Sequence, residues 1–240
     1  MKRQAIRRGI LLASFALFPV TIFYFSPYLV VFGAFSGVVA GSAIMFLLQL
    51  ASAVFLRRAF CGWLCPAGGL QEFEAQAVGK PSKLGKGLLV KYIIWVPWVV
   101  SIVAGFVVAG GVSAVDPLFH IDHGVSVTSL GALAIYLGIV GLFFIPNLFL
   151  GRRAMCHCIC WMAPFMAIGQ KLGTAVHAPQ LHVKAQPDAC VSCHACDKAC
   201  PMSLPVSELV GQGGVDHVEC IQCGACCDSC RKGALELVFE

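Results

Sequence analysis

The chain has 240 residues, of which 58% are hydrophobic and 12% charged, and its formal net charge is +5. Soluble domains carry about 25% charged residues, so this composition disfavours a soluble globular protein and indicates one embedded in a membrane. The chain also contains 14 cysteines.

Three stretches contain no Asp, Glu, Lys, Arg or His: residues 9–56, 92–115 and 124–150. A helix needs roughly 20 apolar residues to cross a bilayer. The first stretch is long enough for two helices, and each of the others for one; the first run is also too long for a cleaved signal peptide. We therefore predict an all-α bundle over residues 1–150, with four transmembrane helices near 10–30, 34–56, 92–113 and 126–150.

The basic residues predict how these spans are oriented. All 17 lysines and arginines fall in the N-terminus, in the loop at 57–91 and from residue 151 onward. Basic loops stay on the cytoplasmic side. We therefore expect a multi-pass protein of the cytoplasmic (inner) membrane with both termini in the cytoplasm. This topology accounts for the positive charge, and no nucleic-acid partner is expected.

Cysteines recur with one spacing in two runs near the C-terminus. Each run reads C-x2-C-x2-C-x3-C, which resembles the bacterial two-cluster ferredoxins. Disulfides are rare in the cytoplasm, so metal or redox chemistry is expected. The resemblance implies two 4Fe–4S clusters, the first held by Cys190, Cys193, Cys196 and Cys230, the second by Cys220, Cys223, Cys226 and Cys200.

Residues 181–240 are accordingly predicted to form a small α+β two-cluster ferredoxin domain, joined to the bundle by a connector at 151–180. The segments LHVKA and ALELVF are candidates to pair as its strands. Two other interpretations are less specific. The string CVSCH matches a haem-attachment motif, but that chemistry needs an oxidising compartment and ignores Cys196 and Cys200. Structural zinc sites also use C-x2-C spacings, without needing this full run.

A second cysteine pattern follows two of the predicted spans. Cys61 and Cys65 form a C-x3-C motif, and so do Cys156 and Cys160. Cysteines four apart share one side of a helix, so two such pairs facing each other would supply four thiolates for a third cluster, with Cys158 as a substitute ligand. A redox-active or assembly-related thiol set and a structural role stay open as alternatives, as does a ligand role for His157.

Together these features resemble the NapH-type membrane quinol dehydrogenases, which have four spans, two cytoplasmic C-x3-C motifs and a C-terminal pair of 4Fe–4S clusters. The resemblance covers nearly the whole chain and extends to membrane domains of the NosR and CcoG types. In the family both motifs usually continue with proline, as at Pro66, whereas Trp161 follows the second motif here.

The resemblance implies a membrane electron-transfer subunit that passes electrons between the quinone pool and a redox partner complex, ferredoxin-like or cytochrome-containing. No acid/base triad is visible, so no catalytic residue is predicted. Two alternatives remain. The chain could serve as a maturation factor for the metal centre of a respiratory enzyme. It could also be a docking subunit that takes electrons from a soluble cytoplasmic donor.

The loop at 114–126 is the polar cluster expected on the outer face. It contains two carboxylates and two histidines: Asp116, His120, Asp122 and His123. Histidine titrates near neutral pH, and a neighbouring carboxylate can relay protons. We expect these residues to take part in proton exit or quinone binding, with a solvated hairpin or a contact to a partner subunit as the alternatives.

Overall fold

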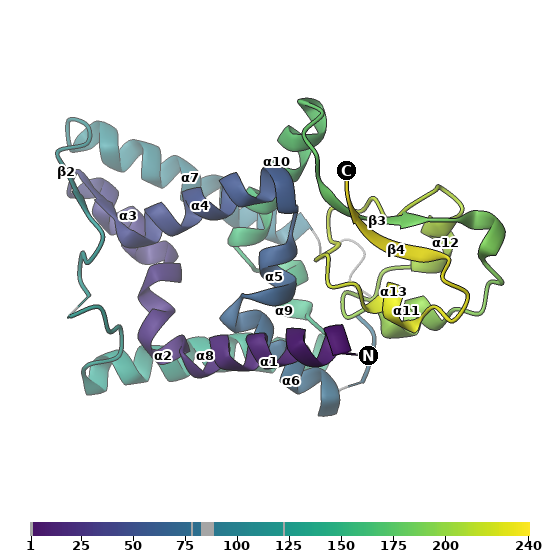
Figure 1. Cartoon of the computed structure of the whole chain (residues 1–240). Helices are drawn as coiled ribbons and strands as arrows, with labels where there is room; N and C mark the ends of the chain where they lie inside the picture. Colours follow the sequence, from purple (N-terminus) through teal and green to yellow (C-terminus); the bar gives the residue numbers. More distant parts are fainter. Residues whose placement is uncertain (1, 78, 83–88, 122) are drawn as a thin grey trace.

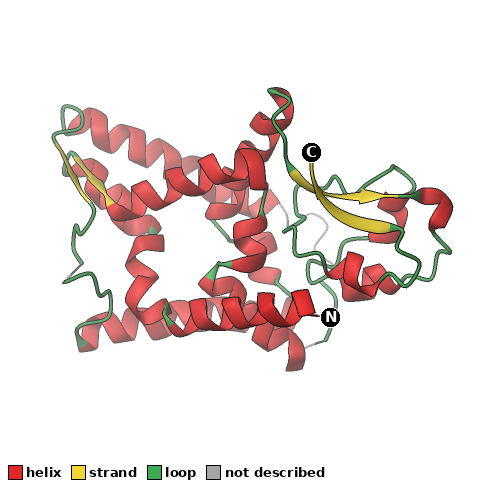
Figure 2. Cartoon of the chain, viewed as in Figure 1, coloured by secondary structure: helices red, strands yellow, loops and turns green. Residues whose placement is uncertain are grey.

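The computed structural model describes residues 2–77, 79–82, 89–121 and 123–240, and within them it is mostly helical (Figures 1 and 2). The helical part occupies one side of the molecule and the ferredoxin-like part the other, with the N-terminus beside the latter (Figure 1). The elements of the helical part are α1 (Lys2–Ala16), α2 (Phe18–Thr21), the 3-10 helix η1 (Ile22–Phe25), α3 (Pro27–Phe35), β1 (Val38–Ala40), α4 (Gly41–Leu56), α5 (Ala59–Trp63), α6 (Pro66–Ala77), α7 (Val90–Val108), β2 (Ala114–Asp116), α8 (Leu130–Leu150), α9 (Ala154–Cys158) and α10 (Met162–Ala175).

Two described helices, α7 and α8, are long and apolar enough to cross a membrane. A third crossing is possible by length if α1 and the α2–η1 segment count as one span, although they are bent by 57° at their break; α4 is apolar but has only 16 residues. The break in the predicted span 10–30 has a local cause. Pro19 lies in the first turn of α2, and a proline there cannot donate to the preceding turn.

The predicted span 34–56 also differs from the structure, because its helix begins only at Gly41. The residues before it form a turn at Gly37, with φ of +69°, and the strand β1. Strand β1 pairs in parallel with β2, so the bundle is not purely helical. A Cβ at Gly41 would lie 2.1 Å from the carbonyl oxygen of Pro117. The outer loop therefore rests directly on the start of α4.

Each helix next to one C-x3-C motif packs against a helix next to the other motif. Helix α4, before the first motif, packs along α10, after the second; helix α8, before the second motif, packs against α6, after the first. Glycine makes the first of these contacts close, because a Cβ at Gly173 would lie 2.1 Å from the carbonyl oxygen of Val54. This reciprocal packing brings the short helices α5 and α9 toward each other.

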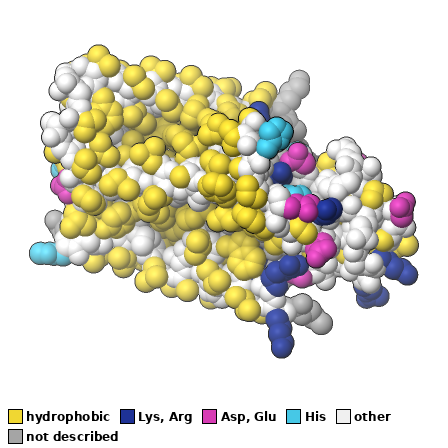
Figure 3. All heavy atoms as spheres, turned by 45° about the horizontal axis from the view of Figure 1, so that its top comes forward, with side chains coloured by type: hydrophobic (Ala, Val, Ile, Leu, Met, Phe, Trp, Pro, Cys, Tyr) yellow, Lys and Arg dark blue, Asp and Glu magenta, His cyan; other side chains and the backbone are white. Residues whose placement is uncertain are grey.

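The surface divides by polarity along the molecule. Apolar side chains cover the face of the helical part seen in Figure 3, and the Lys and Arg side chains visible there gather at the ferredoxin end. Leu130 and Val108 are 85% and 75% exposed. Exposed apolar surface of this extent is typical of a membrane-facing bundle.

The C-terminal part comprises β3 (Leu181–Ala185), η3 (Pro187–Ala189), α11 (Ala195–Ala199), α12 (Val206–Val210), α13 (Ala225–Ser229) and β4 (Leu235–Phe239). Strands β3 and β4 pair antiparallel, with Leu181 opposite Phe239, so the predicted pairing of LHVKA with the C-terminal segment is confirmed. The short helices α11 and α13 pack together, and each ends at the last cysteine of its run. The two cysteine runs therefore lie side by side.

Candidate functional site

The structure brings together the four cysteines that were predicted to hold the first cluster. A cavity of about 440 Å³ is lined by Cys190, Cys193, Cys196 and Cys230. The chain wraps this cavity through left-handed residues, with φ of +52° at Ser192 and +56° at His194. The three cysteines of one run and the last of the other meet because α11 and α13 are adjacent.

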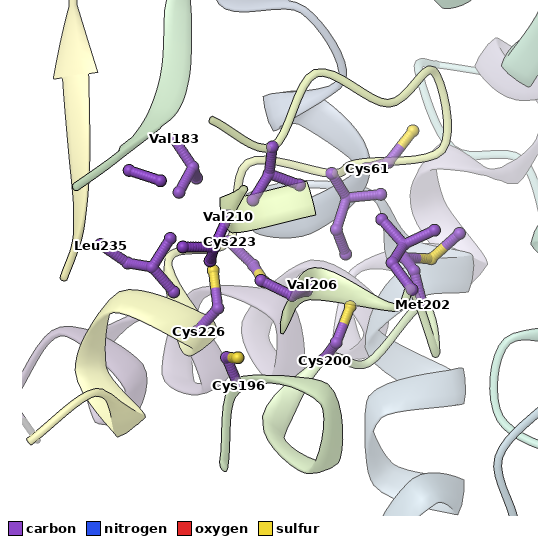
Figure 4. Packing of buried hydrophobic residues seen from close by; sticks show 14 of the residues in the cluster. Cys61, Val183, Cys196, Cys200, Met202, Val206, Val210, Cys223, Cys226 and Leu235 are labelled. Carbon is purple, nitrogen blue, oxygen red and sulfur yellow. The ribbon is translucent and has the colours of Figure 1, made fainter. Parts of the chain in front are cut away.

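The cysteines predicted for the second cluster line a narrower cavity nearer the helical part. They are Cys200, Cys220, Cys223 and Cys226. Burial raises the pKa of the Cys200 thiol to about 11 and that of Cys220 to about 12. Thiols in such surroundings become thiolates when a metal centre supplies compensating positive charge. Figure 4 shows Cys200, Cys223 and Cys226 among the buried side chains.

The first cysteine set is spread more widely than one zinc ion requires. A zinc ion needs its donors within about 2.0–2.3 Å of one point. Among the residues that the structure describes, no three Cys, His, Asp or Glu side chains are arranged to share one metal ion. The first set instead surrounds an open cavity, as a larger inorganic core requires.

The two C-x3-C motifs adopt the same local structure. Each begins with an arginine at the N-cap of a five-residue helix, Arg58 for α5 and Arg153 for α9. Each ends in the same tight turn, in which the second cysteine donates its N–H to the residue just before the first cysteine. These bonds run from Cys65 to the Phe60 carbonyl (2.9 Å) and from Cys160 to the Met155 carbonyl (3.1 Å).

The four thiols of these motifs interact with one another. Burial raises the pKa of the Cys65 thiol well above its usual value, and Cys61, Cys156 and Cys160 raise it further. Burial likewise raises the pKa of Cys160 to about 12, with further contributions from Cys156 and Cys61. The structure therefore gathers the four cysteines predicted as a third ligand set.

Cys158 and His157 interact with other groups. The charges that act on the Cys158 thiol, after burial, are those of Lys91 and Glu219 rather than of the four thiols. Nδ1 of His157 lies 3.4 Å from the carboxylate of Glu219. Both residues therefore face a buried ion cluster, and not the thiols of the two motifs.

Buried cations lie beside the two C-x3-C motifs. Arg7, Arg58, Lys91 and Arg153 are each 1% exposed, and they face two carboxylates, the largely buried Glu72 and the buried Glu219. An unpaired buried charge costs several kcal/mol.

Several donors of these cations also lack hydrogen-bond partners, namely Nε and Nη2 of Arg58 and Nε of Arg153. Cys61 and Cys160 are among the groups whose negative charge would raise the pKa of Arg58, although burial opposes it. An anionic centre on the four thiols would therefore compensate the excess positive charge.

The first C-x3-C motif touches the loop that carries the second cluster's cysteines. The indole Nε1–H of Trp63 donates to the Gln222 carbonyl at 3.0 Å, and a Cβ at Gly62 would lie 2.3 Å from the Ile221 carbonyl oxygen. Cys61 and Cys223 belong to one buried hydrophobic cluster, which Figure 4 shows. The helical part and the ferredoxin-like part therefore meet at two cysteine-bearing segments.

The described outer-loop residues do not gather into one site. Asp116 is exposed and accepts a hydrogen bond from the Leu118 N–H, and His123 is exposed; Asp122 lies outside the described residues. His120 is exposed as well, but it also lines an apolar cavity of about 650 Å³. Its ring packs edge-on against Phe32, with ring centroids 5.0 Å apart.

Sequence reasoning missed the buried ion pairs of the site. The arginines that precede each motif served only to predict topology, although the repeated string Arg-Arg-Ala-x-Cys was a signal of paired sites. Glu72 and Glu219 had no such signal. They acquire their role only through the cations that fold around them.

Comparisons with known proteins agree with the cysteine sites. A protein-family model described as "4Fe-4S binding domain" matches residues 32–84, which contain Cys61 and Cys65. A model described as "4Fe-4S dicluster domain" matches residues 189–235, which contain all eight ferredoxin cysteines.

Curated relatives match over most of the chain. They include the uncharacterized proteins MJ0749 and MJ0750 of Methanocaldococcus jannaschii, each 27% identical, covering 74% and 78% of this chain and 63% and 74% of their own lengths. The Escherichia coli (strain K12) protein YccM, whose name assigns it provisionally to electron transport, is 24% identical over 85% of this chain and 57% of its own length. This chain thus spans about three fifths of two of these relatives. No solved structure matches it. These findings support an iron–sulfur electron-transport protein.

Proposed function

We propose that the chain is a membrane electron-transfer subunit that passes electrons between the quinone pool and a redox partner complex, in the manner of a quinol dehydrogenase. The observation that carries the proposal is the position of the four C-x3-C thiols. Cys61 and Cys156 share a buried cluster with Cys223 of the ferredoxin part, and Cys65 lines an apolar cavity among the helices. A redox centre there would connect a membrane substrate to the ferredoxin clusters.

Three 4Fe–4S clusters are proposed, two on the ferredoxin cysteines and a third on Cys61, Cys65, Cys156 and Cys160. When bound, such clusters accept and release single electrons. The buried guanidinium groups of Arg58 and Arg153 suit a third cluster, because a cluster with four thiolate ligands is anionic and can accept their unpartnered N–H donors. Neutral structural thiols would leave this positive charge uncompensated.

The partner is proposed to meet the protein at the first cluster. Cys193 is the exposed member of its cysteine set, and Val191 beside it is 60% exposed. The second set is more buried and lies closer to α5. A ferredoxin-like or cytochrome-containing partner complex would bind there. The same exposure suits a soluble cytoplasmic donor, so a docking subunit is the second candidate function.

The proposed setting is the cytoplasmic (inner) membrane, with four spans and both termini in the cytoplasm. The apolar helices α7 and α8 and the bent α1–η1 pair support membrane insertion. The Lys and Arg side chains at the ferredoxin end in Figure 3 agree with a cytoplasmic position for that end.

Iron counting tests the third cluster. Anaerobically purified protein is expected to contain about twelve iron atoms and as much labile sulfide, and Cys61→Ser or Cys160→Ser should each lower the iron count by about four. Cys158→Ser is the matched control, because this thiol faces Lys91 and Glu219, and it should leave the count unchanged. About eight irons in the wild type, or an equal loss in the control, would overturn the third cluster.

Reduction by quinol tests the function itself. Adding a quinol analogue to the protein in lipid, with and without its partner complex, should reduce the clusters, observed by electron paramagnetic resonance. Clusters that dithionite reduces but quinol does not, in either preparation, would refute electron exchange with the quinone pool.

A further inference from the structure

The largest apolar cavity described above lies within the helical part and reaches the first C-x3-C motif. It has a volume of about 650 Å³, within the range of roughly 300–1,000 Å³ that small-molecule sites occupy. Among the described residues, its lining comes from the α2–η1 segment, α3, His120, α8 and the residues that begin α6 and α10, and includes no Asp, Glu, Lys or Arg. Such a cavity suits a largely apolar molecule.

The cytoplasmic end of the cavity borders both C-x3-C motifs. Cys65 and Pro66 line it from the first motif, and Trp161, which directly follows Cys160, lines it from the second. The indole Nε1–H of Trp161 is buried and has no hydrogen-bond partner. Its ring packs edge-on against Phe143, with centroids 6.1 Å apart. A ring that lines the cavity therefore carries an unused donor beside the second motif.

The cavity extends from there along α8 toward the outer loop. Its lining on α8 runs from Phe143 to Ile135, which is about 12 Å along the helix axis at 1.5 Å per residue. His120 lines it too, and no hydrogen bond to His120 occurs among the described residues. Tyr28 and Ile135 line the cavity while remaining 67% and 54% exposed, so it opens toward the apolar outer surface.

We propose that this cavity binds the ring of a lipid-soluble quinone or quinol, with a ring oxygen accepting the hydrogen bond of Trp161 Nε1–H. An acyl chain would leave that buried donor unsatisfied, which is costly in an apolar site. A quinone supplies both an acceptor oxygen and an apolar body. The opening at Tyr28 and Ile135 lets its isoprenoid tail lie in the lipid. This inference rests on the proposed function, and it holds for either direction of electron flow.

Photolabelling tests the site in the full protein. A photoreactive azidoquinone with a short isoprenoid tail, added to the protein in lipid nanodiscs, should label peptides that line the cavity, identified by mass spectrometry. Trp161→Phe keeps the aromatic ring and removes the donor, so quinone affinity should fall roughly 3- to 10-fold, the effect of one lost hydrogen bond. Ile139→Trp fills the cavity from α8 and should abolish labelling there.

Trp95→Phe is the matched control. The Trp95 Nε1–H is also buried without a partner, but its ring packs against Phe165 and does not line the cavity. The control should bind the quinone as the wild type does. The assignment would be overturned by labelling outside the cavity, or by equal losses of quinone affinity in the two tryptophan variants. It would also be overturned if an acyl-chain probe competed equally in wild type and Trp161→Phe.

These outcomes separate the inference from the proposed function. If the cavity residues are labelled but quinol does not reduce the clusters, the binding site is supported and the proposed function is refuted. If quinol reduces the clusters of Ile139→Trp as it does those of the wild type, the proposed function is supported and the binding site is refuted.

Discussion

Glu72 holds two buried arginines that surround the C-x3-C motifs, so its replacement tests the electrostatic reasoning about the site. Its carboxylate pairs with Arg153 at 3.0 Å and with Arg7, and Arg153 in turn donates to the Cys61 carbonyl at 3.2 Å. Burial alone would raise the pKa of Glu72, but the two arginines outweigh it and lower the pKa from 4.5 to about 2. The change Glu72→Gln removes the charge and keeps the shape.

The expected loss of stability follows from that pKa. Each pKa unit corresponds to about 1.4 kcal/mol, so the fall from 4.5 to about 2 corresponds to about 3 kcal/mol at neutral pH. Removing one partner of a buried pair typically costs about 3–5 kcal/mol, in agreement with this value. Because the folded pKa is lowered, this stability is present above pH 4.5 and is lost as pH falls toward 2.

The assay is unfolding in detergent at several pH values, followed by tryptophan fluorescence. Glu72→Gln should unfold roughly 6–12 °C below the wild type, with a constant difference between pH 6 and 8. Asp216→Asn is the control, because Asp216 pairs with Arg57 at 2.8 Å but is 74% exposed, and it should lose at most about 1 kcal/mol. A Glu72→Gln loss no larger than the control's, or a difference that grows with pH in this range, would refute the reasoning.

Two further predictions concern neighbouring positions. Burial raises the pKa of Glu74, two residues along α6, from 4.5 to about 7. The stability of its protonated form is therefore fully present only below pH 4.5 and is lost as pH rises through 7. Glu74→Gln should be more stable than the wild type at pH 8.5 and equal to it near pH 4 in the same assay, and an equal pH dependence of the two proteins would contradict this. Gly62→Ala places a methyl group 2.3 Å from the Ile221 carbonyl, so it should slow quinol-driven reduction of the ferredoxin clusters by displacing that loop. Gly141→Ala, with nothing within 4 Å of the new methyl group, is the matched control, and equal rates in the two variants would show that the contact at Gly62 is not needed.

Sequence is most informative where the signal is local. The spacing of the two ferredoxin runs determines which cysteines can share a centre, because a short helix follows the first cysteines of each run and ends at the last. The pairing of β3 with β4 followed from the same motif. Helices α7 and α8 were also evident, since a long uncharged stretch is a property of composition.

Prediction was less accurate where helix ends depend on neighbours. The uncharged stretch 9–56 does not reveal that the chain breaks near Pro19, or that β1 pairs with β2 before α4 begins. The outer loop was predicted as one polar cluster, but of its described residues only His120 reaches the cavity.

By itself, the sequence determined the chemistry available to this protein: cysteines at cluster spacing, apolar helices, and basic residues on one side of them. The tertiary structure decided how these parts combine. The packing of α4 against α10 and of α6 against α8 brings the two C-x3-C motifs together, although about 90 residues separate them. That packing also buries Arg58 and Arg153 and turns Trp161 toward the cavity. Local spacing cannot encode such contacts, because they depend on which helix faces cover one another.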